Sequence, residues 1–183
     1  MEENKKEEEA KDKAQDNNFV KVIKNKIKEV GSDKQKEEIV LTLNNILEEK
    51  SKVNKFIAEK NFAEAEKGYK AILDKIETVL KNENVGNKNE IIEQKKFIMS
   101  NLAFSLKKQN KIKEGMEYDS KVVDELDKKF LKSYVRLIDG YLSEDNIPKA
   151  KEYLDLMKSN VDSEELKKIT EVVADLEKKV NKE

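Results

Sequence analysis

Apolar residues recur every three or four positions along most of the chain, the spacing that places side chains on one face of an α-helix. The stretch from Lys50 to Leu73 holds two such helices, separated only by Glu59-Lys60-Asn61. We therefore predict a helical hairpin here. Its apolar faces carry Val53, Phe56 and Ile57 in the first helix and Phe62, Ala65 and Tyr69 in the second.

The same spacing predicts helices over the rest of the chain, with short polar segments between them. Strict alternation of apolar and polar residues, which is typical of strands, is absent. Five glycines and one proline are also too few for a fold with many tight turns. The chain is predicted to be all-α, with a long helix from Lys34 into the first hairpin and further helices over about 90–108, 112–126, 129–142, 148–158 and 163–180.

The N-terminal region differs from the rest in composition. Residues 1–18 are almost entirely polar or charged, and we expect a disordered tail there. Residues 19–32 read as a short amphipathic helix with an apolar face and a lysine-rich face. Two interpretations stay open for this helix: it binds a membrane surface or partner, or it docks on the body of the protein while its lysines reach into water.

Comparison of the chain with itself reveals a repeated unit. When Ala65 is aligned with Gly115 and Ala150, residues of one kind stand three, nine and twelve positions earlier in every unit. The second and third units are 35 residues apart, and the first and second are 50 apart because both helices of the first unit are extended. The aligned sets are Phe62, Ile112 and Ile147; Phe56, Leu106 and Tyr141; and Val53, Ala103 and Ile138.

Composition narrows the function classes. Charged residues make up 42% of the chain, but the formal net charge is only −1, so no overall field attracts nucleic acid or membrane. The chain has no cysteine and no histidine, and we find no glycine-rich phosphate loop. We therefore expect a protein that is not an enzyme, uses no cofactor or metal, and works in the cytoplasm without spanning a membrane.

Polar residues on the first helix of each unit suggest a binding site. Three cations and two amides at these positions can bind carboxylates, because Arg donates two parallel hydrogen bonds, Lys acts as a point charge and Asn is a neutral donor. Spacings of four place the two residues of the first and third helices on one face. The candidates are Lys50 and Asn54 on the first helix, Asn101 on the second, and Lys132 and Arg136 on the third.

The repeat length and these five residues together resemble a known family. A helix–turn–helix unit of about 34 residues is the tetratricopeptide period. The pattern of KSKVN at Lys50–Asn54, then Asn101, then KSYVR at Lys132–Arg136 resembles the two-carboxylate clamp of tetratricopeptide co-chaperones such as the Hsp-organising protein and the large immunophilins. The resemblance covers the chain from about Leu47 to Val180.

The resemblance implies a definite architecture. It predicts a right-handed α-solenoid of three tetratricopeptide hairpins, with the first helix of each hairpin lining a concave groove. Residues 33–183 would form this domain, with repeats at about 46–80, 96–128 and 131–160, a capping helix over 163–181 and an extra helix at the N-terminal side.

The resemblance also implies a ligand. Proteins with this clamp bind the acidic C-terminal tail, ending Glu-Glu-Val-Asp, of cytosolic ninety- or seventy-kilodalton heat-shock chaperones. The terminal carboxylate and the Asp side chain are the groups that the clamp holds. A groove binder with micromolar affinity, about −8 kcal/mol, is the expectation.

Three further positions and two alternative functions bear on this interpretation. Phe104 is either an apolar contact for the ligand's Val or a core residue, and Asp139 either repels an acidic tail or orients a neighbouring cation. Asp119 departs from the repeat, since Tyr69 and Leu154 stand at the equivalent positions. The alternative functions are a generic repeat scaffold with a different protein partner and, third, a membrane-associated adaptor that uses residues 19–30.

Overall fold

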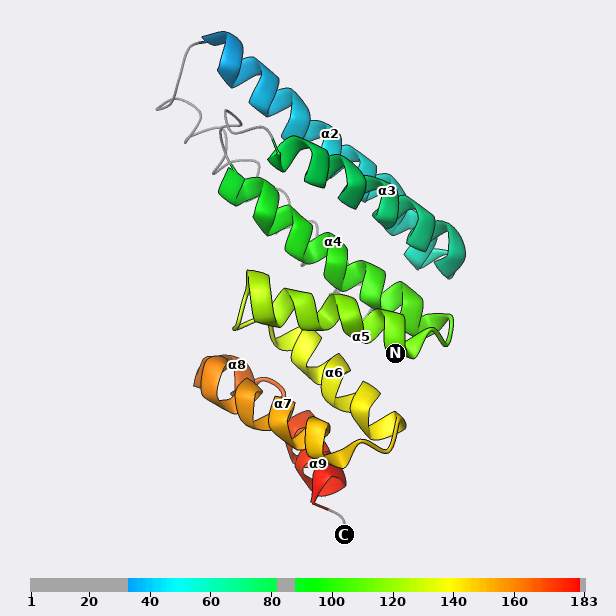
Figure 1. Ribbon diagram of the computed structural model, residues 1–183, viewed down its shortest axis with the longest axis vertical. Helices are drawn as coiled ribbons and strands as arrows, with labels where there is room; N and C mark the ends of the chain where they lie inside the picture. Colours follow the sequence, from blue (N-terminus) through cyan, green and yellow to red (C-terminus); the bar gives the residue numbers. More distant parts are fainter. Residues whose placement is uncertain (1–32, 82–87, 182–183) are drawn as a thin grey trace.

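The computed structural model describes residues 33–81 and 88–181, with side chains from residue 42 onward. The predicted tail over 1–18, the predicted helix over 19–32 and most of the polar segment before residue 88 lie outside these residues. The described part contains eight α-helices and no strand, which confirms the all-α prediction. Figure 1 shows the helices following one another along the length of the molecule, from α2 at one end to α9 at the other.

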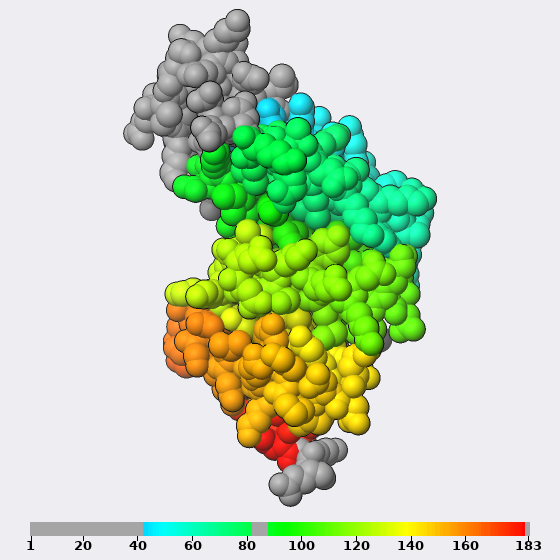
Figure 2. Space-filling view, viewed as in Figure 1, coloured from blue at the N-terminus to red at the C-terminus, as the bar shows by residue number. Residues whose placement is uncertain are grey.

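The helices pack in sequential antiparallel pairs. The pairs are α2 (Asp33–Ala58) with α3 (Phe62–Leu80), α4 (Lys88–Lys108) with α5 (Ile112–Lys121), and α6 (Leu131–Ser143) with α7 (Ile147–Asn160). Each second helix also packs against the first helix of the next pair, α3 on α4 and α5 on α6. The space-filling view shows the pairs as successive bands along the molecule (Figure 2).

The turns inside the three pairs have the same backbone structure. In each, one residue is left-handed, with φ of 59° at Lys60, 62° at Asn110 and 57° at Asp145. The amide of the next residue then donates to the carbonyl five positions earlier, an arrangement that ends a helix by satisfying its last carbonyl groups. These bonds run from Asn61 to Phe56 at 2.8 Å, from Lys111 to Leu106 at 2.9 Å and from Asn146 to Tyr141 at 2.8 Å.

Burial follows the repeat in the same register. Ala65, Gly115 and Ala150 are all buried, as predicted for small residues where two helices approach closely. A side chain at Gly115 would place its Cβ 3.0 Å from the backbone oxygen of Ala103 on α4, so the helices are too close for a larger residue. Val53, Ala103 and Ile138 are buried as well.

The apolar core has two parts that meet at a short π-helical segment, Val122–Leu126, which continues α5. Val122 belongs to the core formed mainly by α2, α3 and α4, whereas Val123 belongs to the core of α6, α7 and α9. Successive residues therefore join the two cores and fix the third helix pair against the second. The sequence predicted an ordinary helix up to residue 126.

The C-terminal segment differs from its predicted form. The capping helix expected over 163–181 consists of two helices, α8 (Ser163–Lys167) and α9 (Thr170–Val180). The amides of Lys168 and Ile169 bond to carbonyls only three residues back, which tightens and ends α8. Helix α9 then packs on α6 and α7 and buries Leu176 and Val180, so it covers the end of the stack.

Candidate functional site

Lys50 is a largely buried cation on α2. Its side chain crosses to α4, where Nζ donates to Gln94 Oε1 at 3.3 Å and lies 5.4 Å from the centre of the Phe97 ring. Gln94 is itself 1% exposed. These two contacts of the cation are with an amide and an aromatic face.

Asn54 and Asn101 come together across the first two helix pairs. Asn54 Oδ1 accepts a hydrogen bond from Tyr69 Oη at 2.6 Å and a longer one from Asn101 Nδ2 at 3.4 Å. Both asparagines are half-buried. Within the described part of the chain, the Nδ2 group of Asn54 makes no hydrogen bond, so its two N–H donors remain for another acceptor.

Arg136 on α6 forms a bidentate ion pair with Asp119 on α5. Arg136 Nε lies 2.8 Å from Asp119 Oδ2, and Nη2 lies 2.5 Å from Oδ1. Ser100 Oγ on α4 accepts from Nη2 at 2.6 Å, and Ser133 Oγ donates to Asp119 Oδ1 at 2.6 Å. Arg136 thus joins α6 to two other helices, α4 and α5.

The charge of Arg136 is compensated inside the protein. Asp119 is 2% exposed, whereas the Arg136 side chain keeps 16% of its surface accessible. Burial raises the pKa of Asp119 above its ordinary value, although the bonds from Arg136 and Ser133 favour the ionised carboxylate. The sequence predicted a cation here, but the structure contains a neutral pair with its guanidinium outermost.

Lys132 is exposed and lies one helical turn before Arg136 on α6. Phe104, three residues after Asn101, is half-buried and packs edge to face on Phe62, with ring centres 6.1 Å apart. Lys108 Nζ lies 5.4 Å from the centre of the same ring. Phe104 therefore has a packing role and keeps an accessible surface.

Asp139, which sequence analysis treated as either repelling or orienting, forms an ion pair with Lys107 on α4. The two side chains are 47% and 33% exposed, so the pair is partly solvated. Its partner comes from the neighbouring first helix. Asp139 thus provides a second link between α4 and α6, beside the Arg136–Ser100 contact.

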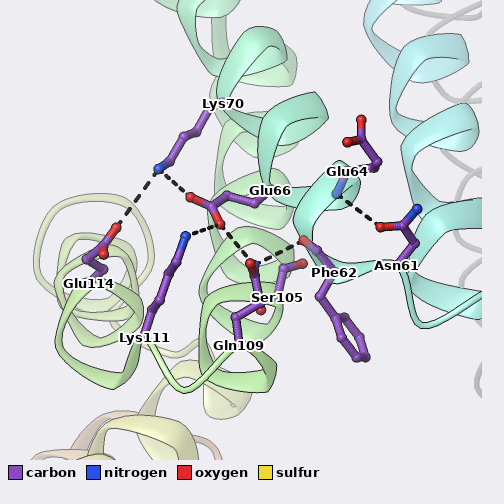
Figure 3. Close-up of polar contacts among 9 residues, drawn as sticks. All are labelled: Asn61, Phe62, Glu64, Glu66, Lys70, Ser105, Gln109, Lys111 and Glu114. Carbon is purple, nitrogen blue, oxygen red and sulfur yellow. Dashed lines mark hydrogen bonds and ion pairs between the residues drawn. The ribbon is translucent and has the colours of Figure 1, made fainter.

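A second polar cluster surrounds Glu66 on α3, and sequence analysis missed it. Figure 3 shows Glu66 in the centre, with Lys70, Gln109 and Lys111 pointing toward its carboxylate. The donors lie at 2.7 Å for Lys70, 2.9 Å for Gln109 and 2.8 Å for Lys111. Burial opposes ionisation of Glu66, but the hydrogen bonds from these three side chains outweigh it and lower its pKa from 4.5 to about 2.

Lys96 on α4 is a further buried cation near the candidate site. Its Nζ pairs with Asp127 at 2.8 Å and with Glu93 at 2.6 Å, and it lies 4.9 Å from the centre of the Phe97 ring. Burial opposes the charged form of Lys96, yet the hydrogen bonds that Lys96 donates to Asp127 and Glu93 outweigh this and raise its pKa. Lys50 and Lys96 therefore share one aromatic ring, which couples their positions.

The structure thus joins four of the predicted residues through α4, while Lys132 lies on the surface of α6. Asn54 and Asn101 are in contact, Lys50 reaches Gln94, and Arg136 reaches Ser100, the neighbour of Asn101 in sequence. The residues that sequence analysis missed are Gln94, Phe97, Ser100 and Asp119. A signal existed for Asp119, because an acidic residue stands at a repeat position that is otherwise Tyr or Leu. Arg136, which was predicted, also stands out in the sequence because it is the only arginine among 38 basic residues.

Comparisons with known proteins do not assign a family. No protein-family model matches the sequence, and no curated protein is significantly similar to it. Within the described residues, no group of acidic side chains is arranged to hold a metal ion. No helix in that part of the chain is long and apolar enough to cross a bilayer.

Proposed function

We propose that the chain is a cytoplasmic, non-enzymatic adaptor of the tetratricopeptide type that binds the acidic C-terminal tail of heat-shock chaperones. The three helix pairs would be its repeats, stacked as a right-handed solenoid. The observation that carries the proposal is the set of contacts that joins Lys50, Asn54, Asn101 and Arg136 through α4. Donors from three first helices thereby lie on neighbouring elements, as recognition of two carboxylates requires.

Two further observations support the repeat part of the proposal. The three turns share one left-handed residue and one hydrogen-bond pattern, five residues before a buried small residue in each case. Two of the aligned sets, the small residues and the set of Val53, Ala103 and Ile138, are also buried in all three units. Such agreement between sequence register and backbone geometry is expected when hairpins of one kind stack side by side.

The charge balance around the site fits a carboxylate ligand. Lys50 contacts the neutral amide of Gln94 and the Phe97 ring, and Lys132 is exposed. The acidic neighbours Asp119 and Asp139 are each paired with a cation. A carboxylate that approaches Lys50 and Lys132 therefore meets acids whose charge is already compensated, which lowers the repulsion it would otherwise meet.

Calorimetric titration with three matched peptides tests the proposal. One ends in free-acid Glu-Glu-Val-Asp, one carries an amidated C-terminus, and one ends in Asn. We expect micromolar binding of the first and much weaker binding of the other two, because each lacks a carboxylate that the site would hold. Equal affinity for all three, or no heat at high micromolar peptide, would exclude the proposed ligand.

The variant Lys132→Ala, with Lys151→Ala as its matched control, assigns the binding to α6. Both residues are exposed lysines of the third helix pair, but Lys151 lies on α7. Loss of one charge-assisted bond of about 1.5–3 kcal/mol should weaken binding roughly ten- to a hundredfold for Lys132→Ala only. Equal effects of both variants would indicate a nonspecific charge effect. Arg136 is unsuitable for this test, because its ion pair makes it part of the structure.

The alternative function is a generic repeat scaffold with another protein partner. The observation in its favour is the ion pair of Arg136 with Asp119. This pair leaves α6 with less net positive charge than a carboxylate-binding site would ideally have. The same titration separates the two functions, since a generic scaffold would not distinguish free-acid from amidated tails.

A further inference from the structure

Arg136 is the only arginine in a sequence whose other 37 basic residues are lysines. The chemistry of its position explains why lysine would not serve there. A guanidinium can pair with a carboxylate through two parallel bonds and still donate to other groups, whereas an ammonium acts as a single point charge. At this position the side chain meets Asp119 and Ser100 simultaneously.

The donors of Arg136 divide into a used edge and an unused side. Nε and Nη2 donate to Asp119, and Nη2 also donates to Ser100 and, at 3.3 Å, to Ser133. Nη1, which carries two N–H groups, has no hydrogen-bond acceptor within the described part of the chain. Since the side chain is 16% exposed while Asp119 is nearly inaccessible, the used edge faces inward.

We propose that Asp119 is a positioning residue, whose buried carboxylate fixes Arg136 so that Nη1 is the group offered to a ligand carboxylate. This inference rests on the proposed function and adds how the site is preorganised. Arg136 then contributes a directed pair of hydrogen bonds to the ligand carboxylate. A ligand carboxylate would contact Nη1 without displacing Asp119.

Two serines complete the support. Ser133 is fully buried and fixes Asp119 by donating to Oδ1. Ser100 accepts from Nη2 and precedes Asn101. It therefore ties the guanidinium to the segment of α4 that carries the Asn101 amide. The relative positions of the Arg136 and Asn101 donors are thereby set before a ligand arrives, and such preorganisation reduces the entropy lost on binding.

The first test uses Asp119→Asn and the three peptides described above. Discrimination is the ratio of the dissociation constant of the peptide that lacks one carboxylate to that of the complete peptide. With Arg136 no longer held, we expect discrimination against one of the two altered peptides to fall at least about fivefold. If both ratios stay unchanged, Asp119 is only structural, and if either rises, it opposes the ligand; both results would overturn the proposal.

Nuclear magnetic resonance gives an independent readout, because a single arginine produces a single Nε–Hε signal. We expect this signal to shift in Asp119→Asn, which breaks its bond. In the natural chain, the Nη1 signals should shift more than the Nε signal when the complete peptide is added. A larger change at Nε than at Nη1 would mean that the ligand displaces Asp119, contrary to the proposal.

A second variant keeps the proposal testable if Asp119→Asn does not fold. Ser100→Ala removes an acceptor of Arg136, and its matched control is Ser105→Ala, another buried serine of α4 that donates to the backbone oxygen of Asn101. We expect reduced discrimination for Ser100→Ala alone and recovery in Ser100→Thr, which retains the hydroxyl. Equal discrimination in the two alanine variants would contradict the positioning role. If the natural chain itself shows no discrimination, the proposed function fails, and that result is distinct from these.

Discussion

Two buried acid–base clusters join neighbouring helix pairs, one around Glu66 and one around Arg136, and they are built in opposite ways. In the first, a central carboxylate accepts hydrogen bonds from two lysines and a glutamine. In the second, a central guanidinium donates to a carboxylate and a serine. The first cluster joins α3 to the turn between α4 and α5, whereas the second joins α6 to α4 and α5.

The difference shows which cluster can also bind a ligand. Lys70, Gln109 and Lys111 donate to the Glu66 carboxylate and lower its pKa to about 2, while Lys70 also pairs with Glu114 and Gln109 also donates to two backbone oxygens. Around Arg136, Nε and Nη2 donate to Asp119 and to two serines, whereas Nη1 has no acceptor within the described residues. Burial meanwhile raises the pKa of Asp119, although Arg136 and Ser133 donate to its carboxylate. The Glu66 cluster has a structural role. The Arg136 cluster has a structural role too, and it also keeps the Nη1 donors of Arg136 available for a ligand.

The largest effect should come from breaking the second cluster. Arg136→Met leaves the Asp119 charge buried without a partner, and we expect a loss of about 3–5 kcal/mol in the free energy of unfolding. Adding Asp119→Leu removes the unpaired charge and should restore much of that loss. Chemical denaturation of both variants measures this coupling. A small effect of Arg136→Met would show that the pair contributes little to stability.

Breaking the first cluster should have a smaller effect that depends on pH. The folded pKa of Glu66 lies below its ordinary value of 4.5, so its stabilisation is fully present above about pH 5 and is lost as the pH falls toward 2. We expect Glu66→Gln to cost about 1–3 kcal/mol at pH 7 and to flatten the decline in stability between pH 5 and 2.

The control for this comparison is Glu64→Gln. Among the described residues, the Glu64 carboxylate pairs with Lys67 alone, on the surface, where both side chains are well exposed. Such a pair contributes little to stability, because solvent screens it. Thermal unfolding at several pH values should therefore separate the two variants. If Glu64→Gln flattened the acid decline equally, the decline would not come from Glu66.

The smallest effect on stability should come from the solvated link between α4 and α6. Asp139→Asn removes the partner of Lys107 from a partly exposed ion pair, and we expect a change below about 1 kcal/mol. Because the released Lys107 adds a cation beside the candidate site, affinity for the complete acidic peptide should rise. Calorimetry checks the second expectation, and weaker binding would show that Asp139 positions Lys107 for the ligand.

Much of the fold followed from the sequence, because helical spacing and the repeat register are local properties of the chain. The turns at Lys60, Asn110 and Asp145 lie at the same position in each repeat, five residues before the aligned small residue. The π-helical segment at Val122–Leu126 and the end of α8 at Lys167 did not follow, since each depends on packing between helix pairs. Spacing alone does not encode which core a residue such as Val123 enters.

The candidate site was predicted less completely than the fold. Register placed Lys50, Asn101 and Arg136 on the first helices, but it does not tell which side chains meet them across an interface. Asp119 comes from a second helix, and its contact with Arg136 depends on the depth at which α5 packs on α6. The neutral pair at this position is therefore a property of tertiary packing.

The three left-handed turn residues have a practical consequence for engineering. None of them is glycine, and this conformation costs a side-chain-bearing residue about 1–2 kcal/mol relative to its ordinary backbone, less for Asn and Asp than for Lys. Glycine adopts it without that penalty. Lys60 and Asp145 thus offer sites outside both polar clusters where thermal tolerance can be raised to offset a destabilising change elsewhere, and Lys60 offers the larger gain, whereas Asn110 lies between Gln109 and Lys111 of the Glu66 cluster.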